Sequence, residues 1–187
     1  MKTSFSLTVW AARCRGSNTN CLYPDERTAT DAETLIRIVA NDHTFIRFKN
    51  NYRSESNFLY TDVLVVDCDN THSDDPEKWV TKEDIAEEFA DVAMLIYTSR
   101  NHMKTKDGKA PRPKYHVIFF IDRITDPVKY KRLLKRVQET YPYFDDNAQD
   151  AARFFYGNSD AEVYYQPGVL SLSMFFDEDG FANMDRE

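Results

Sequence analysis

Apolar residues alternate with polar ones, or form short unbroken runs, along several segments of the chain, and these patterns predict strands. The segment 5–11 has the period of a half-buried strand, with Phe5, Leu7 and Val9 on one side. The run 63–66 is unbroken and mostly β-branched, which is typical of a strand buried on both faces. We expect strands at 5–11, 43–48, 58–66, 94–97, 116–121, 153–156, 162–165 and 170–176.

Helices are predicted where a capping residue precedes apolar positions at helical spacing. Thr30 with Glu33 has the pattern of a capping box, and Thr81 opens a second such pattern. Asp126 precedes a proline, which suits the first turn of a helix. We expect helices at 30–39, 81–90 and 126–140, and a loop of turn-forming residues at 13–27. Because strands outnumber helices and the two alternate, the predicted class is α/β or α+β, built around a mixed sheet.

The composition is that of one folded domain. The chain has 187 residues, of which 42% are hydrophobic, so a sizeable apolar core can form. No apolar run approaches the roughly 20 residues that span a bilayer, and the three cysteines form no Cys-x-x-Cys pair. We therefore expect a cytoplasmic protein with reduced thiols and no membrane partner. We expect a single domain over 1–187, with an N-terminal elaboration at about 1–57, a core at 58–176 and an acidic tail at 177–187.

Two acids follow the buried run at 63–66. Because strand side chains alternate, Asp67 and Asp69 project to the same side, roughly 7 Å apart, and Cys68 points the other way. Two carboxylates so close repel each other unless a cation lies between them or one is protonated, so the pair predicts a site for Mg²⁺ or Mn²⁺. The alternative is a strand that simply ends in solvent at an acidic turn.

A group of cationic and hydrogen-bonding residues enters the strand predicted at 116–121. Arg112, Lys114 and His116 are spaced two residues apart, so an extended backbone places them on one side. Such an arrangement suits a triphosphate, because arginine offers a planar fork, lysine a point charge and histidine a directional donor. The alternative is a solvated basic loop with a histidine at the end of a strand.

The distribution of charge bears on nucleic-acid binding. A net charge of −7 counts against a nucleic-acid partner, but basic residues concentrate in two segments, the loop 100–114 and the predicted helix 126–140. These segments predict a cationic surface that holds the backbone of a template. The predicted DNA-binding residues are Arg100, Lys104, Lys106, Lys109, Lys131, Arg132 and Lys135.

Three clusters along the chain combine into a larger pattern. They are Asp67-Cys68-Asp69 after a hydrophobic strand, His116 behind Arg112-Pro113-Lys114-Tyr115, and Phe144-Asp145 followed by Asp150-Ala151-Ala152-Arg153-Phe154-Phe155. Together they resemble the three motifs of the archaeo-eukaryotic primase superfamily, most closely the primase-polymerases and replication proteins of plasmids, phages and related mobile elements. The resemblance covers about residues 61–166.

The resemblance implies a fold, an activity and partners. The fold is a primase-polymerase catalytic core that resembles an RNA-recognition motif, packed with an N-terminal α/β unit. The activity is template-directed nucleotidyl transfer, as a DNA primase, a DNA polymerase or both, with two Mg²⁺ or Mn²⁺ ions. The implied partners are a single-stranded DNA template and primer, deoxynucleoside or ribonucleoside triphosphates, and a helicase or further domains of a longer chain.

The resemblance also assigns site residues. Asp67 and Asp69 are expected to hold the metal ions, with Asp145 as the third catalytic carboxylate because it directly follows an apolar approach. His116 and Arg153 are expected to contact the phosphates of the nucleotide, beside the basic residues Arg112 and Lys114. Asp146 and Asp150 are alternates for the third carboxylate. The family usually has Ser two residues before the histidine, where this chain has Lys114.

Two other classes of function fit some of the same residues. The haloacid dehalogenase phosphatases share a buried strand followed by Asp-x-Asp-x-Thr, which would make Asp67 a nucleophile and Asp69 a general acid. The segment 95–99 would then correspond to the second motif of that family, and the pair 145–146 to its acidic fourth motif. However, about sixty residues precede the strand, and 112–121 and 150–156 are left without a role. The third class is a non-catalytic module that binds single-stranded nucleic acid.

Overall fold

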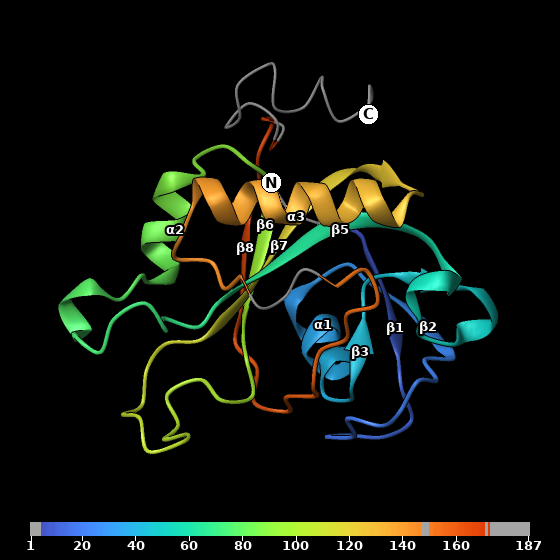
Figure 1. Ribbon diagram of the computed structural model, residues 1–187, viewed down its shortest axis with the longest axis horizontal. Helices are drawn as coiled ribbons and strands as arrows, with labels where there is room; N and C mark the ends of the chain where they lie inside the picture. Colours follow the sequence, from blue (N-terminus) through green and yellow to red (C-terminus); the bar gives the residue numbers. More distant parts are fainter. Residues whose placement is uncertain (1–4, 147–149, 171, 173–187) are drawn as a thin grey trace.

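The computed structural model describes residues 5–146, 150–170 and 172, and its fold is α+β with two antiparallel sheets (Figure 1). The strands are β1 (Leu7–Ala11), β2 (Asp25–Ala29), β3 (His43–Thr44), β4 (Arg47–Phe48), β5 (Phe58–Cys68), β6 (Met94–Thr98), β7 (Tyr115–Ile124) and β8 (Val163–Gln166). The α-helices are α1 (Ala32–Val39), α2 (Lys82–Glu88) and α3 (Pro127–Thr140), and single 3₁₀ turns lie at Lys49–Asn51, Glu55–Asn57 and Pro76–Lys78. Within the described ranges, no helix has both the length and the apolar character needed to cross a membrane.

The larger sheet has the strand order β4-β5-β7-β6-β8. Strands β5 and β6 run in the same direction, but β7 is inserted between them and is antiparallel to both. The outer pairs β4–β5 and β6–β8 are also antiparallel. The expected mixed sheet was therefore wrong, because every pair of adjacent strands in the larger sheet is antiparallel.

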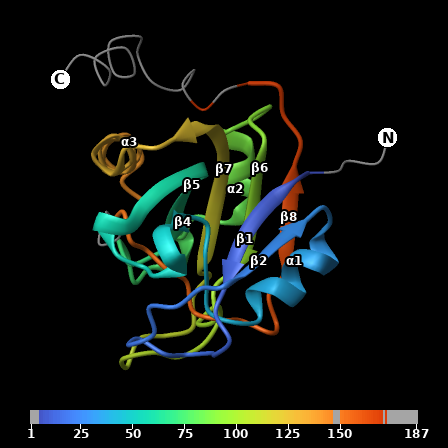
Figure 2. The same ribbon diagram turned by 90° about the vertical axis from the view of Figure 1, so that its right-hand side faces the viewer.

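The larger sheet is the middle layer of the molecule, and its two faces contribute to different cores. One face packs against the smaller sheet, with order β2-β1-β3, and against α1, as Figure 2 shows on its right-hand side. The other face packs against α2 and α3. Successive residues of β5 divide between the faces, so that Val63 and Val65 contact the first core while Leu64 and Val66 contact the second. The central strand is thus buried on both faces, as its apolar run predicted.

Several other predicted elements are confirmed. The strands expected at 58–66, 94–97, 116–121 and 162–165 correspond to β5, β6, β7 and β8. Thr81 closes a capping box with Asp84 at the start of α2, as the sequence indicated. Asp126 caps α3 by accepting a hydrogen bond from the backbone of Val128.

Four predictions need correction. Part of the loop expected at 13–27 is strand β2, whose exposed polar residues show no apolar alternation. Asp31, not Thr30, is the N-cap of α1 and accepts from the backbone of Thr34. The single strand expected at 43–48 is divided into β3 and β4, which belong to different sheets. The segment 153–156 forms one isolated bridge, between Phe155 and His43, instead of a strand, and most of the strand expected at 170–176 lies outside the described residues.

The segment that carries Arg153 and Phe155 is fixed to the N-terminal layer by a buried carboxylate. Asp42 is fully buried and accepts hydrogen bonds from the backbone N–H of Gly16 at 2.8 Å, Ser17 at 2.9 Å and Gly157 at 2.7 Å. Gly157 lies so close to the end of α1 that a Cβ atom there would overlap the carbonyl oxygen of Ala40. Only glycine therefore allows this approach of two backbones.

Gly157→Ala is predicted to lower the free energy of unfolding by about 1–3 kcal/mol, because the added methyl group has no space and the backbone must shift. Urea denaturation measures the change. Ser159→Ala, an exposed substitution two residues away, is the matched control and is expected to stay within about 0.5 kcal/mol of the unmodified protein. Equal stability of the two variants would contradict the close approach.

Candidate active site

The two acids of the first motif lie at the end of β5, on the face that packs against the smaller sheet. Cys68, between them, points into the opposite core and is fully buried. The ladder register places His116 of β7 directly opposite Asp67. Asp67 and Asp69 both line one cleft, so the expectation that they share a side is confirmed.

The Asp67 carboxylate is enclosed by two partners from distant parts of the chain. His116 Nδ1 lies 2.6 Å from Asp67 Oδ1, and Arg153 donates a hydrogen bond to Asp67 Oδ2. The Asp67 side chain is only 13% exposed. Burial acts to raise the pKa of Asp67, but the charges and hydrogen bonds of His116 and Arg153 outweigh it and hold that pKa at about 2. Asp67 is therefore an ionised, hydrogen-bonded carboxylate at neutral pH.

The other two carboxylates are held by different groups. Lys114 Nζ donates to Asp69 Oδ2 at 3.0 Å. Thr71 Oγ1 donates to Asp145 Oδ1 at 2.9 Å, and the Asp145 backbone N–H donates to the Asp67 carbonyl oxygen at 2.8 Å. Burial raises the pKa of Asp145, and the nearby charges of Asp69 and Asp67 raise it further. These like charges are thus close enough to repel one another.

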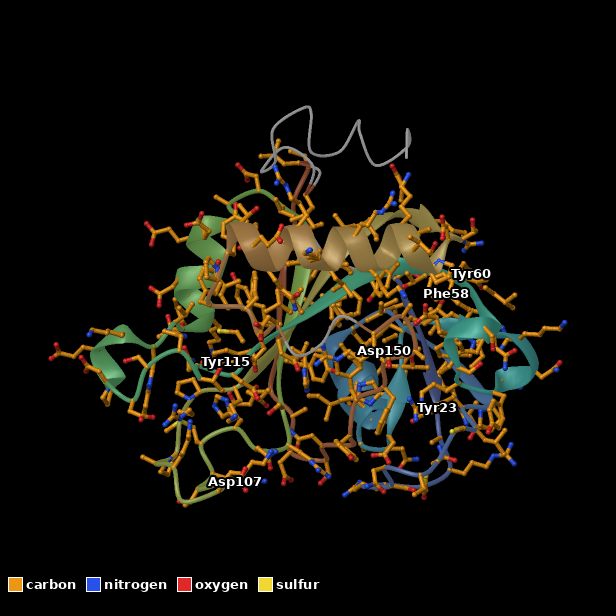
Figure 3. All side chains as sticks on the ribbon, in the orientation of Figure 1. Tyr23, Phe58, Tyr60, Asp107, Tyr115 and Asp150 are labelled. Atoms are coloured by element: carbon orange, nitrogen blue, oxygen red, sulfur yellow. The ribbon has the colours of Figure 1, made fainter. Side chains whose placement is uncertain are left out.

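The three carboxylates open into one cleft of about 380 Å³. Its acidic floor faces a basic wall formed by the loop 99–114, at whose outer end Asp107 lies (Figure 3). The cleft is lined by Asp67, Asp69, Thr71, Lys104, Lys106, Asp107, Lys109, Ala110, Arg112, Lys114, Asp145 and Arg153. A cavity with carboxylates at one end and lysines and arginines at the other can hold a polyanion beside a cation.

Of the three residues predicted to share one side at the entry to β7, only two contact the acids. Lys114 and His116 contact Asp69 and Asp67, as described above. Arg112 is 3% exposed, and its guanidinium donates to the carbonyl oxygens of Asn70 at 2.9 Å and Ser73 at 3.2 Å and to Asp74 at 2.8 Å. Arg112 thus fastens the loop that follows the acid pair, and its guanidinium is engaged there.

Among the three candidates for the third carboxylate, only Asp145 lines the cleft. Asp146 is exposed and borders an adjoining hollow with Lys135. Asp150 is exposed, and its side chain accepts a hydrogen bond from the backbone N–H of Ala152. The choice of Asp145 over the other two agrees with this placement.

The predicted DNA-binding residues do not form one surface. Lys104, Lys106 and Lys109 line the cleft, and Arg100 lies over the ring of Tyr156. Helix α3 lies above the sheet in Figure 1, away from the loop 99–114, and its Lys135 borders the adjoining hollow together with Thr71 and Asp145. On that helix Lys131 is paired with Glu55, Lys135 lies 3.7 Å from Glu139, and Arg132 is exposed.

The chemistry of the donor set fits a hard divalent cation, although the side chains are not drawn together around one point. Asp67, Asp69 and Asp145 offer only carboxylate oxygens, which Mg²⁺ and Mn²⁺ prefer. Within the part of the chain that the structure describes, no three His, Cys, Asp or Glu side chains are grouped closely enough to hold one ion. Lys114 and Arg153 instead neutralise two of the carboxylates.

An aromatic cluster positions His116, and its members were not predicted as site residues. The His116 ring lies 4.8 Å from that of Tyr97 and 4.9 Å from that of Phe155. The buried His43 donates from Nδ1 to the Asn41 carbonyl oxygen at 2.9 Å, so its Nε2 accepts from the Tyr97 hydroxyl at 2.8 Å. Tyr97 could have been found from the sequence only with the β6–β7 register, which places it opposite His116.

Thr71 was also not predicted as a partner of Asp145. Thr71 follows Asp69 by two residues, as Asp69 follows Asp67, and this spacing could have indicated from the sequence that its hydroxyl belongs to the site. The hydroxyl now satisfies one oxygen of Asp145, so it sets the direction of the third carboxylate.

No protein-family model, no curated protein and no solved structure matches this chain. The resemblance to the primase superfamily therefore depends on the motif residues themselves. The function is inferred from the cleft, its charges and its contacts.

The stability of the fold is predicted to fall as the pH drops from about 6.5 to about 4, in part through His43. Burial lowers the pKa of His43 to about 4, so the native state keeps this ring neutral, whereas the unfolded chain binds a proton near pH 6.5. Above pH 6.5 His43 is neutral in both states and costs no stability. At pH 4 the proton bound by the unfolded chain lowers the free energy of unfolding by on the order of 3 kcal/mol.

Urea denaturation across this pH range measures the effect, with His43→Gln expected to flatten the dependence between pH 4 and 6.5. The exposed His72 gives the control His72→Gln, which is expected to keep the dependence of the unmodified protein. A slope that is the same with and without His43 would show that this residue is not held neutral.

Proposed function

We propose that the protein catalyses template-directed nucleotidyl transfer, as a DNA primase, a DNA polymerase or both, in the replication of a mobile element or a related pathway. The observation that carries the proposal is the meeting of three carboxylates with a lysine and an arginine in one cleft, where a histidine behind the lining hydrogen-bonds one of the acids. Asp67, Asp69 and Asp145 come from two segments almost eighty residues apart, and the fold brings them together. This combination suits the transfer of a phosphoryl group from a triphosphate.

The order of the elements supports the proposed catalytic core. From β5 onward the chain follows the order β5, α2, β6, β7, α3, β8, which is the β-α-β-β-α-β order of ferredoxin-like folds. The sheet departs from that fold at one edge, since β8 pairs with β6 while β4 occupies the position beside β5. Asp67 and His116 lie opposite each other on the directly paired strands β5 and β7, which this departure leaves unchanged.

Each residue of the cleft has a role in the proposal. Asp67, Asp69 and Asp145 would hold Mg²⁺ or Mn²⁺, and two such ions would supply Lewis-acid chemistry, activation of a primer 3′-hydroxyl and neutralisation of a leaving pyrophosphate. Lys114 and Arg153 already lie within hydrogen-bonding distance of carboxylates, so phosphate oxygens bound by these two side chains lie next to the acids. Arginine contributes two parallel donors and lysine a point charge.

The lysines of the loop 99–114 extend the basic wall away from the acids. Lys104, Lys106 and Lys109 line the same cleft and are exposed. Exposed cations bind phosphates with a strength that falls as salt rises. Their position suits the outer phosphates of a nucleotide or the backbone of a strand that enters the cleft.

The phosphatase alternative is less well supported by the geometry. Thr98, the hydroxyl that the second phosphatase motif would supply, lines a different cavity and accepts a hydrogen bond from the backbone of Glu162. That motif therefore does not meet Asp67.

The first test is primer extension with Mn²⁺ or Mg²⁺, labelled nucleotides and a single-stranded template, with and without primer. We expect products that lengthen by single nucleotides. Asp67→Asn is predicted to reduce the rate roughly a hundredfold or more, because it removes a carboxylate on which charge neutralisation at the reacting phosphate depends. Asp62→Asn is the matched control, since Asp62 lies on the same strand but is exposed and pairs with Arg123.

Two results would contradict the proposal. One is the absence of any extended product from the folded protein. The other is hydrolysis of a generic phosphate ester that depends on Asp67, which would assign the cleft to a phosphatase. Products that form without a primer would identify priming in addition to extension.

Arg153 is predicted to act on the nucleotide as well as on Asp67. Arg153→Gln is expected to raise the KM for the incoming nucleotide by about tenfold to a hundredfold, the loss of a charge-assisted hydrogen bond. Steady-state kinetics with Arg123→Gln, an exposed arginine that pairs with Asp62, provide the comparison. A fall in kcat with an unchanged KM would mean that Arg153 only positions Asp67.

A further inference from the structure

Beside the cleft, two neighbouring aromatic rings lie in a row between two arginine side chains. The guanidinium of Arg53 lies 4.6 Å from the ring centre of Phe154, and that of Arg100 lies 3.6 Å from the ring centre of Tyr156. The two rings are 4.9 Å apart. We refer to Arg53, Phe154, Tyr156 and Arg100 as the aromatic–arginine row. All four are partly exposed.

The row lies against a loop that contains no acidic residue. Residues 12–24 include Arg13 and Arg15 but neither Asp nor Glu, and Arg13 is paired with Asp25 at the start of β2, which leaves Arg15 as the cation of the loop without a carboxylate partner among the described residues. The buried Asp42 binds this loop through Gly16 and Ser17 and binds the row's own segment through the N–H of Gly157. Loop and row are therefore held together by one buried carboxylate.

The figures place these segments at one end of the molecule. In Figures 1 and 2 the loop 12–24 and the basic loop 99–114 lie at the bottom, with the segment after Arg153 passing between them. Arg100 also bridges the two loops, because its guanidinium lies beside Gly16. The glycine has a φ of +75°, so a larger residue there is disfavoured.

The row is continuous with the cleft. Arg153 lines the cleft, and the next residue, Phe154, belongs to the row. At the other end, Lys104 lines the cleft and donates from Nζ to the carbonyl oxygen of Arg100 at 2.9 Å. A chain bound along the row would thus lie beside two residues that line the cleft, Arg153 and Lys104.

The chemistry of the row suits single-stranded nucleic acid. Nucleobases stack on aromatic rings and on guanidinium planes, and a sequence-independent strand site combines such platforms with cations that follow the backbone. A guanidinium that is fixed over a ring keeps its edge N–H groups for phosphate oxygens. Within the described residues, no carboxylate is paired with Arg100 or Arg53, whereas Lys131 on α3 is paired with Glu55.

We propose that the aromatic–arginine row and the loop 12–24 form the binding track for a single-stranded nucleic acid whose end lies in the cleft. The proposal rests on the proposed function for the position of the strand end, but binding along the track requires neither a nucleotide nor a metal ion. It differs from the sequence prediction, which assigned part of this role to α3.

Fluorescence anisotropy tests the proposal, with a labelled oligothymidylate of about 15 nucleotides, in a buffer with EDTA and at several salt concentrations. Tyr156→Leu is expected to weaken binding about fivefold or more, through loss of a stacking ring. Arg100→Gln is expected to weaken binding and to reduce the slope of log K against log salt by about 0.7, the value of one backbone contact on a single strand.

Two variants serve as controls that should bind like the unmodified protein. The double variant Lys131→Gln, Arg132→Gln removes basic residues of α3, and Arg123→Gln removes an exposed arginine that pairs with Asp62 on the neighbouring strand. Thermal unfolding of each variant verifies that it is folded. Arg100→Gln provides a second test should Tyr156→Leu fail to fold.

The track is overturned if the unmodified protein does not bind the oligonucleotide, if both row variants bind normally, or if only the α3 variant loses binding. Failure of the proposed function has a different signature. In that case binding is present and depends on the row, while no metal-dependent extension occurs. If the row variants instead bind the oligonucleotide normally and also extend primers normally, the proposed track is wrong and the proposed function stands.

Discussion

The burial of one carboxylate, Asp67, is the constraint on which the rest of the site depends. A charged group at the end of an apolar strand is costly unless opposite charges and hydrogen bonds compensate it. His116 and Arg153 provide this compensation from two other parts of the chain. The contact with His116 requires one register of β5 against β7, because a slip by one residue would turn every side chain of the strand to the other face.

The second partner of Asp67 ties the site to the N-terminal layer. Arg153 lies on a segment that pairs with His43 through backbone hydrogen bonds of 2.9 and 2.7 Å and that is anchored at Gly157 by Asp42. Both anchoring residues precede the proposed core in the sequence. The N-terminal layer therefore supports the candidate site. The change from one sheet to the other lies between β3 and β4, before the division expected at about residue 57.

The elements with strong local signals were predictable. The apolar run of β5 and the caps of α2 and α3 depend on neighbouring residues, and both the strand and the helices occur as expected. Alternation was sufficient to place Asp67 and Asp69 on one side. Strand β2 was missed because its middle residues are exposed and polar, and the pairing with β1 that stabilises it is a long-range contact.

The contacts within the site were harder to predict than its members. The sequence identified Arg112 as basic and extended, but not that the loop 70–74 would supply its acceptors. Arg153 and Asp67 are 86 positions apart, and the aromatic enclosure of His116 joins three segments. Such encounters are determined by the packing of the layers, for which a single sequence gives no local pattern.

The charges around the cleft oppose the charge of the whole molecule. Six cationic and four acidic side chains line it, whereas the protein carries a net charge of −7. At about 0.01 M salt, where the screening length is about 30 Å, a distant polyanion meets mainly the net repulsion, and it meets attraction only on close approach. The rate of capture should therefore rise at first as salt is added, while the lifetime of the bound state shortens. An intermediate ionic strength would then favour turnover over either extreme.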